Sequence, residues 1–248
     1  MMVKSQKLAI EGVAHGFFGR KFGRSSGLFA SLNGSKFVGD DDLCVQQNLD
    51  IVKCELNASR IVTLKQMHNK VCIIVDSSTE SDIEADAMIT KATDVAIGVL
   101  TADCAPVLLV DEENKIVGAV HAGWKGLASG VIEFTINKMS GLYGEPRKIK
   151  AAIGPCIHKS NYEVGEDFQQ RFMEADEYFF KINSKTHFDL PGYCKHKLLK
   201  AGLLEDNIEI LNVNTYADSK NYFSYRYASQ NTGGICGRNI SAICLRQR

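Results

Sequence analysis

The sequence predicts a single α+β domain over residues 1–248, with mixed β-sheets and flanking helices. Apolar runs typical of strands alternate with segments of helical spacing, and no linker, internal repeat or low-complexity segment separates them. The chain has 248 residues, of which 45% are hydrophobic and 23% are charged. This is enough apolar sequence for one large core, so a single domain is expected.

Strands are expected where short apolar runs end in turn residues. The runs on either side of TADC, and the run after DEENK, are nearly continuous in small and β-branched residues, which is typical of strands covered on both faces. His68 falls at the turn between two of these runs. The expected strands are 13–18, 61–68, 70–76, 96–100, 105–110, 115–121, 148–157, 208–214 and 237–245.

Helices are expected where apolar residues recur at helical spacing. The segment 40–57 begins with acidic residues, which favour a helix N-terminus. Its apolar positions are Leu43, Val45, Leu49, Val52 and Leu56. Further helices are expected at 131–139, at 166–175, and at 187–203, where Pro191 lies near the start.

Charge and cysteine content indicate the kind of partner and the compartment. Lys+Arg and Asp+Glu balance at 29 each, so no net basic field is available to gather nucleic acid or an anionic membrane. A small-molecule partner is therefore expected. The eight cysteines include no C-x-x-C pair, and a chain of this length needs no disulfides, so reduced thiols are expected. No signal peptide or membrane span is apparent, which predicts a soluble cytoplasmic protein.

Two imidazoles and one thiol stand in the segments QMH, TADCAP and HAGWKG, as His68, Cys104 and His121. Three protein ligands that leave a fourth position open are typical of catalytic zinc. Two nitrogens and one sulfur suit zinc or copper better than calcium or magnesium. His68 lies 36 residues before Cys104, and His121 lies 17 residues after it, so only the fold can bring them together. We expect zinc, with copper as an adventitious occupant.

Two glycine-rich segments are candidates for anion binding. The loop GRKFGRSSG carries Arg20, Lys21 and Arg24, which either hold a phosphate or form a solvated basic loop. HAGWKG leads from a strand into a helix, where free N–H groups and the helix dipole favour an anion. For Gly123 and Gly126 the alternative is a tight turn that needs glycine for its geometry alone.

Polar residues interrupt an apolar run at Asp103 and Cys104. A buried carboxylate is costly unless it is paired or hydrogen-bonded, so chemistry or a turn is expected there. Further along the chain, Phe223, Tyr225 and Arg226 suit stacking on a base and contact with a phosphate. A buried aromatic cluster fits these three residues equally well.

The segments HGFFGR, SLNG, QMH, TADCAPVLL, AVHAGWKG, IGPCI, YEVG, FDL and FSYR follow one another between about His15 and Arg238. In these segments and their order the chain resembles the YfiH or laccase-domain family, and TADC with HAGW is a specific pair. The resemblance implies a fold related to cysteine hydrolases, with zinc at His68, Cys104 and His121. The functions attached to that family are polyphenol oxidase, purine nucleoside phosphorylase with adenosine deamination, and peptidoglycan editing factor.

Of these functions, a zinc-dependent purine nucleoside enzyme suits the residues best. Phosphorolysis needs a phosphate clamp and a group that protonates the departing purine, whereas adenosine deamination needs an activated water. The expected catalytic residues are Cys104, His121 and Asp103, with Asp103 as the acid. The expected substrate-binding residues are Arg20, Asn33, Gln66, Lys125 and Arg226.

Two other functions remain open. Cys104, activated by His121 as a thiolate nucleophile, would suit a hydrolase that edits a peptidoglycan precursor. A non-catalytic nucleotide-binding protein with a structural zinc is the third possibility, although structural sites are normally closed by four ligands. A copper polyphenol oxidase is not expected, because a multicopper site needs roughly ten histidines, mostly in His-x-His pairs. This chain has six histidines and no such pair.

Overall fold

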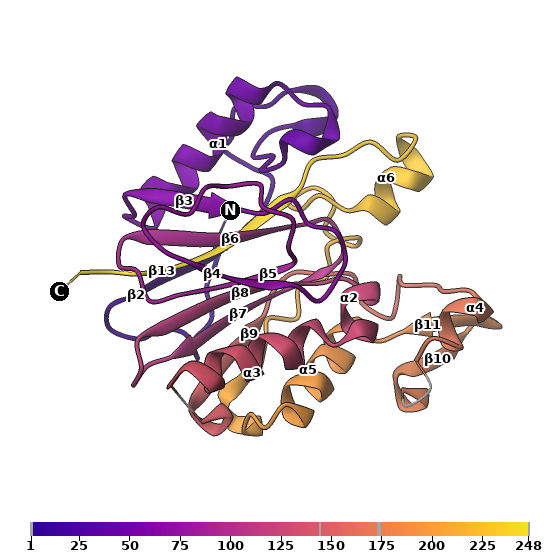
Figure 1. Cartoon of the computed structure of the whole chain (residues 1–248). Coiled ribbons are helices and arrows are strands. Elements are labelled where there is room, and N and C mark those ends of the chain that lie inside the picture. Colours follow the sequence, from indigo (N-terminus) through magenta and orange to yellow (C-terminus); the bar gives the residue numbers. More distant parts are fainter. Residues whose placement is uncertain (1, 144, 173–174, 248) are drawn as a thin grey trace.

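The computed structural model describes residues 2–143, 145–172 and 175–247. Two mixed β-sheets lie face to face, and helices cover their outer surfaces (Figure 1). The α+β class with mixed sheets and flanking helices is therefore confirmed. Among the described residues, no helix is long and apolar enough to cross a membrane.

The first sheet has five strands and contains both ends of the described chain. Within it, β3 runs parallel to β6, whereas β13 runs antiparallel to both β2 and β6. Its strands, in spatial order, are β1 (Met2–Val3), β2 (Val13–Phe18), β13 (Asn239–Leu245), β6 (Val95–Thr101) and β3 (Arg60–Thr63).

The second sheet has six strands, and its centre is the antiparallel pair of β7 and β8, in which every residue is buried. Its strands, in spatial order, are β12 (Ile208–Ile210), β9 (Ile149–Ile153), β7 (Ala105–Asp111), β8 (Ile116–Ala122), β5 (Ala87–Thr90) and β4 (Cys72–Val75). A separate hairpin consists of β10 (Phe179–Ile182) and β11 (Lys185–Phe188).

Helices close both outer faces of the sheets. The α-helices are α1 (Asp42–Glu55), α2 (Trp124–Ser129), α3 (Val131–Tyr143), α4 (Glu166–Gln169), α5 (Leu190–Lys200) and α6 (Tyr225–Asn231). Short 3-10 turns are Gly27–Phe29, Lys36–Val38, Pro146–Lys148, Asp176–Tyr178 and Glu205–Asn207. In Figure 1, α1 lies above the first sheet, and α3 and α5 lie below the second.

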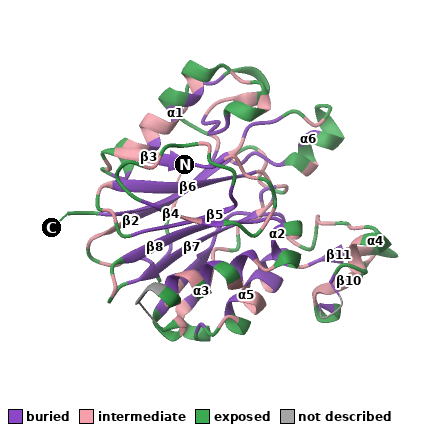
Figure 2. Cartoon of the chain, in the orientation of Figure 1, coloured by how far each residue is buried: buried purple, intermediate pink, exposed green. Residues whose placement is uncertain are grey.

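The hydrophobic core forms three layers between these elements. The middle layer lies between the sheets and includes Phe17 and Ile97 of the first and Leu108 of the second. An upper layer joins α1 to the first sheet, and a lower layer joins α3 and α5 to the second. The strands are accordingly buried, whereas the outer helical surfaces are exposed (Figure 2). Strands covered on both sides explain the continuous apolar runs of the sequence.

The helices differ from the predicted ones, and two of them, α2 and α6, lie in segments for which the sequence predicted no helix. The segment 166–175 forms only α4, because Phe172 alone is buried within 166–172, and a helix with so little buried surface is marginal. Part of that prediction, residues 173–174, lies outside the described residues. The helix predicted from residue 187 begins instead at Leu190, where the Asp189 side chain accepts a hydrogen bond from Gly192 N. In α1, Leu43 points to solvent.

Candidate metal centre and substrate cavity

The three predicted metal ligands meet where the two sheets join. The chain leaves β6 of the first sheet and enters β7 of the second through residues 102–104, which include Cys104. His121 lies near the end of β8, paired with Pro106 of β7. His68 lies in the segment that connects β3 to β4. The fold thus brings together residues from three separate parts of the chain.

The donor atoms of these three residues fit a metal ion such as zinc. One ligand atom each of His68, Cys104 and His121 lies within 4.8 Å of the others, and Cys104 Sγ lies 3.9 Å from His68 Nε2. Tetrahedral zinc, with bonds of about 2.0 to 2.3 Å, separates its donors by roughly 3.3 to 3.8 Å. Small side-chain movements would therefore close this group around an ion.

A buried carboxylate, Asp86, supports two of the three ligands. Its Oδ1 accepts a hydrogen bond from His121 Nδ1 at 2.7 Å, which leaves Nε2 of that ring available to a metal. The same carboxylate accepts hydrogen bonds from the backbone N–H groups of Met67, His68 and Asn69 at 2.8 to 3.0 Å. We did not predict this residue, which is the last acid of the segment ESDIEAD before the apolar run that forms β5.

The backbone around the ligands is unusual for two reasons. His68 and Asp103 have positive φ angles of 59° and 88°, which residues other than glycine adopt mainly at turns and functional sites. Gly123, in contrast, has an ordinary φ of −75°. A Cβ on it would lie 2.9 Å from His68 Cδ2 and 3.1 Å from Cys104 Sγ. The ligands therefore occupy the space that any other residue at position 123 would fill.

The thiol of Cys104 and the imidazole of His121 favour a charged pair in the metal-free protein. Burial opposes ionisation of Cys104, but the charge of His121 and hydrogen bonds from both histidines outweigh it and lower the pKa of the thiol to about 6. Burial likewise opposes a charged His121, but Cys104 and the Asp86 carboxylate raise its pKa to about 9. Thiolate and imidazolium therefore coexist between these two values.

We expect the Cys104 thiolate of the metal-free protein to titrate near pH 6, against 9.0 for an ordinary thiol. Thiolate ultraviolet absorbance, with metal-free Cys104→Ala as the background, measures this directly. The stability contributed by the pair is lost as the pH falls through about 6, where Cys104 is protonated, and as it rises through about 9, where His121 loses its proton. A Cys104 midpoint near that of free cysteine would contradict this assignment.

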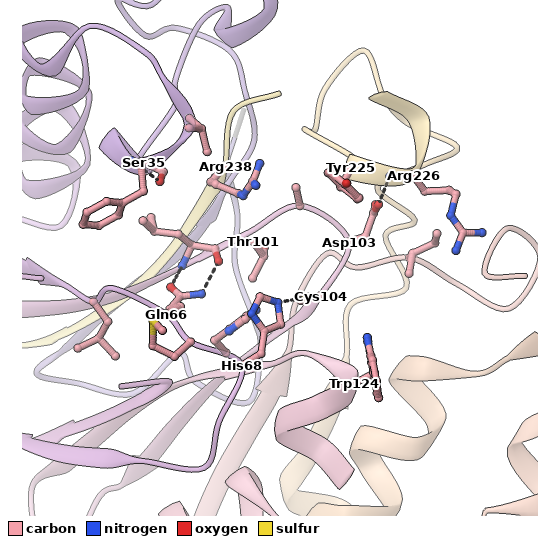
Figure 3. A pocket seen from close by; sticks show the side chains of 18 of the residues that line it. Ser35, Gln66, His68, Thr101, Asp103, Cys104, Trp124, Tyr225, Arg226 and Arg238 are labelled. Atoms are coloured by element: carbon pink, nitrogen blue, oxygen red, sulfur yellow. Dashed lines mark hydrogen bonds between the residues drawn. The ribbon is translucent and has the colours of Figure 1, made fainter. Parts of the chain in front are cut away.

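A cavity of about 600 Å³ opens over the metal ligands. This volume is typical of sites for small molecules. Figure 3 shows the polar residues of its lining, with His68 and Cys104 at its centre. The lining is Ser35, Phe37, Val38, Leu64, Lys65, Gln66, Met67, His68, Leu100, Thr101, Ala102, Asp103, Cys104, His121, Trp124, Ile157, Tyr162, Leu190, Tyr225, Arg226 and Arg238.

Asp103 lines this cavity beside Cys104 and is buried. Its Oδ1 accepts a hydrogen bond from Thr215 Oγ1 at 2.7 Å, and its Oδ2 accepts one from Arg226 N at 2.6 Å. Burial raises the pKa of the carboxyl above its ordinary value, although these hydrogen bonds oppose the shift. The carboxylate that interrupts the apolar run is thus hydrogen-bonded, as its burial requires.

Two of the predicted substrate-binding residues line the cavity. The side-chain amide of Gln66 donates a hydrogen bond to Leu100 O and accepts one from Leu100 N, both at 2.7 Å. This pair of bonds holds the cavity wall in place. Arg226 donates from Nη2 to Glu163 O and lies 5.6 Å from the ring centre of Tyr162. Lys125, in contrast, is exposed outside the lining, with its Nζ over the Trp124 ring.

Arg20 and Asn33 lie behind the cavity wall and not in its lining. Arg20 donates to Ala30 O at 2.7 Å and to Ser219 O at 3.2 Å, and its guanidinium lies over the ring of Phe223. Asn33 is fully buried, and its amide is saturated by hydrogen bonds. The Asn33 amide therefore holds loops in place, and Arg20 also holds loops, through its Nε and Nη1 groups.

The chain belongs to the family described as multi-copper polyphenol oxidoreductase laccase, whose model matches residues 14–246. The resemblance to the YfiH or laccase-domain family is thereby confirmed. A purine nucleoside phosphorylase of Deinococcus radiodurans is 34% identical over 225 residues, which cover 89% of this chain and 86% of that protein. A protein of Streptomyces griseus named purine nucleoside phosphorylase ORF3 is 35% identical over 245 residues, or 96% of this chain and 98% of its own length.

Solved structures of the same family share the fold. YlmD from Geobacillus stearothermophilus superposes with a TM-score of 0.90 at 26% identity, and covers 98% of this chain and 94% of its own. The Neisseria meningitidis protein NMB0706 superposes with a TM-score of 0.85 at 30% identity, and covers 100% and 99%. The names of the curated relatives bear out the expectation of an enzyme.

Proposed function

We propose that this protein is a zinc-dependent purine nucleoside phosphorylase. The observation that carries the proposal is the His68, Cys104 and His121 group at the centre of a cavity large enough for a nucleoside. The curated relatives named purine nucleoside phosphorylase, which this chain matches over most of its length, support it. A bound zinc ion would supply a Lewis acid with an open coordination position, because only three protein ligands converge.

The chemistry of phosphorolysis defines what the protein must provide. An oxygen of phosphate forms a bond to C1′ of the ribose, the bond from C1′ to the purine nitrogen breaks, and its electron pair leaves with the base. The base then needs a proton, and the products are ribose 1-phosphate and the free purine. Trp124 and Tyr162 offer aromatic faces in the cavity against which a purine can stack.

Asp103 is the proposed proton donor to the departing purine. It lines the cavity next to Cys104, and burial raises its pKa, which keeps a proton available nearer to neutral pH. Asp103→Asn should lower kcat for inosine by about 10²-fold or more, the range of general acid catalysis. Steady-state kinetics of the zinc-loaded variant measures this loss.

A substrate whose departing base needs no proton distinguishes loss of proton donation by Asp103 from structural damage in Asp103→Asn. The base of 7-methylguanosine is already cationic and leaves as a neutral molecule, so Asp103→Asn should lose less than about 10-fold on it. Equal losses on both nucleosides would mean that Asp103 acts only by holding Thr215 and the first turn of α6. In that case the proton would come from another group.

The proposed function itself is tested by following products with chromatography. The purified protein, with its zinc content measured, is incubated with adenosine or inosine, with and without phosphate. We expect free purine and ribose 1-phosphate only when phosphate is present; inosine formed from adenosine would report deamination. If neither nucleoside is consumed at protein concentrations that cleave a serine-containing muropeptide precursor, the nucleoside assignment is wrong.

One observation supports hydrolysis of a peptidoglycan precursor as a second candidate. Cys104, His121 and Asp86 form a series of thiol, imidazole and buried carboxylate, in which the imidazole donates to the carboxylate. Cysteine hydrolases use this arrangement, with the thiolate as nucleophile. We rank it second because His68 also faces the thiol and completes a metal site.

Polyphenol oxidation by several coppers does not suit this chain, despite the description of its family. Among the described residues, one group of three potential metal ligands is found, and it consists of His68, Cys104 and His121. A mononuclear site together with a trinuclear cluster needs many more imidazoles than this. A single copper ion at the site would be adventitious. The free state of all eight cysteines suits a reducing compartment such as the cytoplasm.

A further inference from the structure

One side of the cavity contains a buried hydroxyl whose function is unexplained. Thr101, the last residue of β6, is 1% exposed and lines the cavity, and its Oγ1 has no hydrogen-bond partner among the described residues. Such an unpaired buried group costs about 1 to 3 kcal/mol, so natural proteins rarely leave one without a reason. Because Thr101 lines the cavity, a ligand there can supply the missing partner once the Thr101 side chain turns its buried hydroxyl toward the cavity.

Arg238 lines the same side of the cavity as Thr101 (Figure 3). Asn239 of β13 pairs with Thr101, so Arg238 precedes the residue that lies directly opposite. Arg238 Nη1 donates to Cys236 O at 2.8 Å and to Gly237 O at 3.1 Å, which fixes the plane of the guanidinium. In the part of the chain that the structure describes, no group accepts from its Nε or Nη2. These N–H groups are therefore free for a ligand in the cavity.

The same side of the cavity carries a second hydroxyl, that of Ser35, and Asn33 holds it together with Arg238. The Asn33 carbonyl oxygen accepts hydrogen bonds from Ser35 N at 3.0 Å and from Arg238 N at 2.8 Å. The Ser35 hydroxyl itself accepts from Phe37 N, so its own proton remains free to donate. One fully buried amide thus fixes two segments that are far apart in the sequence.

We propose that Ser35, Thr101 and Arg238 form a subsite for a phosphate group, which the reaction uses for inorganic phosphate. A guanidinium and two hydroxyls can all donate, and donors on several sides suit a tetrahedral oxyanion. The nearby carboxylates are engaged elsewhere, Asp40 with Asn33 and Asp103 with Arg226 N. In Figure 3, Thr101 lies between Arg238 and the ligands His68 and Cys104.

The assignment of this subsite to inorganic phosphate rests on the proposed function. It also indicates from which side of the cavity phosphate would approach the nucleoside. Phosphate would approach from the side of β6 and β13, whereas Trp124 lies on the other side of the cavity (Figure 3). Arg226 also belongs to that other side, because its guanidinium donates to Glu163 O and lies over Tyr162. The phosphate contact that the sequence suggested for the Arg20 loop is accordingly proposed for Arg238 instead.

Equilibrium binding of inorganic phosphate tests the subsite without any turnover. Calorimetric titration of the zinc-loaded full chain is compared among wild type, Arg238→Met, Thr101→Val and the control Arg147→Met, which removes an exposed cation far from the cavity. Arg238→Met should raise the Kd for phosphate at least 10-fold, and Thr101→Val about 3- to 10-fold, as expected for hydrogen bonds to a charged group. Arg147→Met and the zinc content should not change.

Several results would overturn this assignment. A wild-type protein that does not bind phosphate excludes the subsite, as does an unchanged Kd in both Arg238→Met and Thr101→Val. Repeating the titration with adenosine 5′-monophosphate distinguishes inorganic phosphate from the phosphate of a nucleotide. If the variants weaken binding of the nucleotide but not of inorganic phosphate, inorganic phosphate is not the ligand of the subsite. If phosphate binding depends on Arg238 but the protein catalyses no phosphorolysis, the subsite is supported and the proposed function is wrong.

Discussion

Replacing Cys104 by alanine should remove zinc from the purified protein and lower the rate of phosphorolysis by about 10³-fold or more. Thiolate is the one anionic donor of the His68, Cys104 and His121 group, so the two imidazoles that remain would hold the ion weakly. A bound metal contributes several kcal/mol of charge stabilisation to a transition state, and about 1.4 kcal/mol corresponds to a factor of ten. Metal analysis and steady-state kinetics on the same sample measure both losses.

The matched control for this variant is Cys54→Ala, which removes an exposed cysteine of α1 far from the cavity. It should keep full zinc content and full activity. Zinc bound at wild-type stoichiometry and affinity in Cys104→Ala would show that the thiol is not a ligand. If such a variant were nevertheless inactive, Cys104 would be the nucleophile instead.

Asp86→Asn should weaken zinc binding by about 10- to 100-fold, the usual effect of removing a carboxylate that orients a ligand histidine. The Asp86 carboxylate accepts hydrogen bonds from His121 Nδ1 and from three consecutive backbone N–H groups. Asparagine has one oxygen acceptor, and its NH₂ group faces donors, so some of these groups lose their partner. Each unsatisfied buried donor costs about 1 to 3 kcal/mol, and two of them would lower the free energy of unfolding by about 2 to 6 kcal/mol.

Competition with a chromophoric chelator measures the zinc affinity of Asp86→Asn, and denaturant unfolding of the metal-free protein measures its stability. Asp111→Asn is the matched control, because Asp111 is equally buried and accepts hydrogen bonds from Asn114, away from the metal ligands. That control should lose stability without losing zinc affinity. An unchanged zinc affinity in folded Asp86→Asn would refute the orienting role of Asp86.

Much of the fold was predictable because its strands are buried on both faces. The apolar runs of β6, β7 and β8 correspond closely to the predicted strands, since two sheets and two helical layers cover them. The helix predicted at 166–175 exists only as the short α4, because its spacing is helical but its surface is mostly exposed. Which strands pair, and in which sheet, depends on contacts between distant residues that local pattern does not encode.

The candidate site was predictable in its chemistry and less so in its supporting residues. Residue types showed that His68, Cys104 and His121 suit a metal, and the family resemblance implied that they meet; in the structure their donor atoms lie close together. Asp86 was missed because it ends an acidic segment, Glu80 to Asp86, whose other acids are exposed or half-buried, and local sequence does not show that this one is buried. The sequence suggested Asn33 and Arg20 as substrate-binding residues, and it could not show that both also hydrogen-bond to loops of the protein itself.

The most direct test of the central claim is the rate of ribose 1-phosphate formation from inosine as a function of bound zinc. Metal-free protein is titrated with zinc, and activity and metal content are measured on each sample. The proposed mechanism predicts no turnover without metal and a linear rise that ends at one zinc ion per chain, with no product in the absence of phosphate. Full turnover by the metal-free protein would contradict it and would assign the chemistry to the Cys104 thiolate.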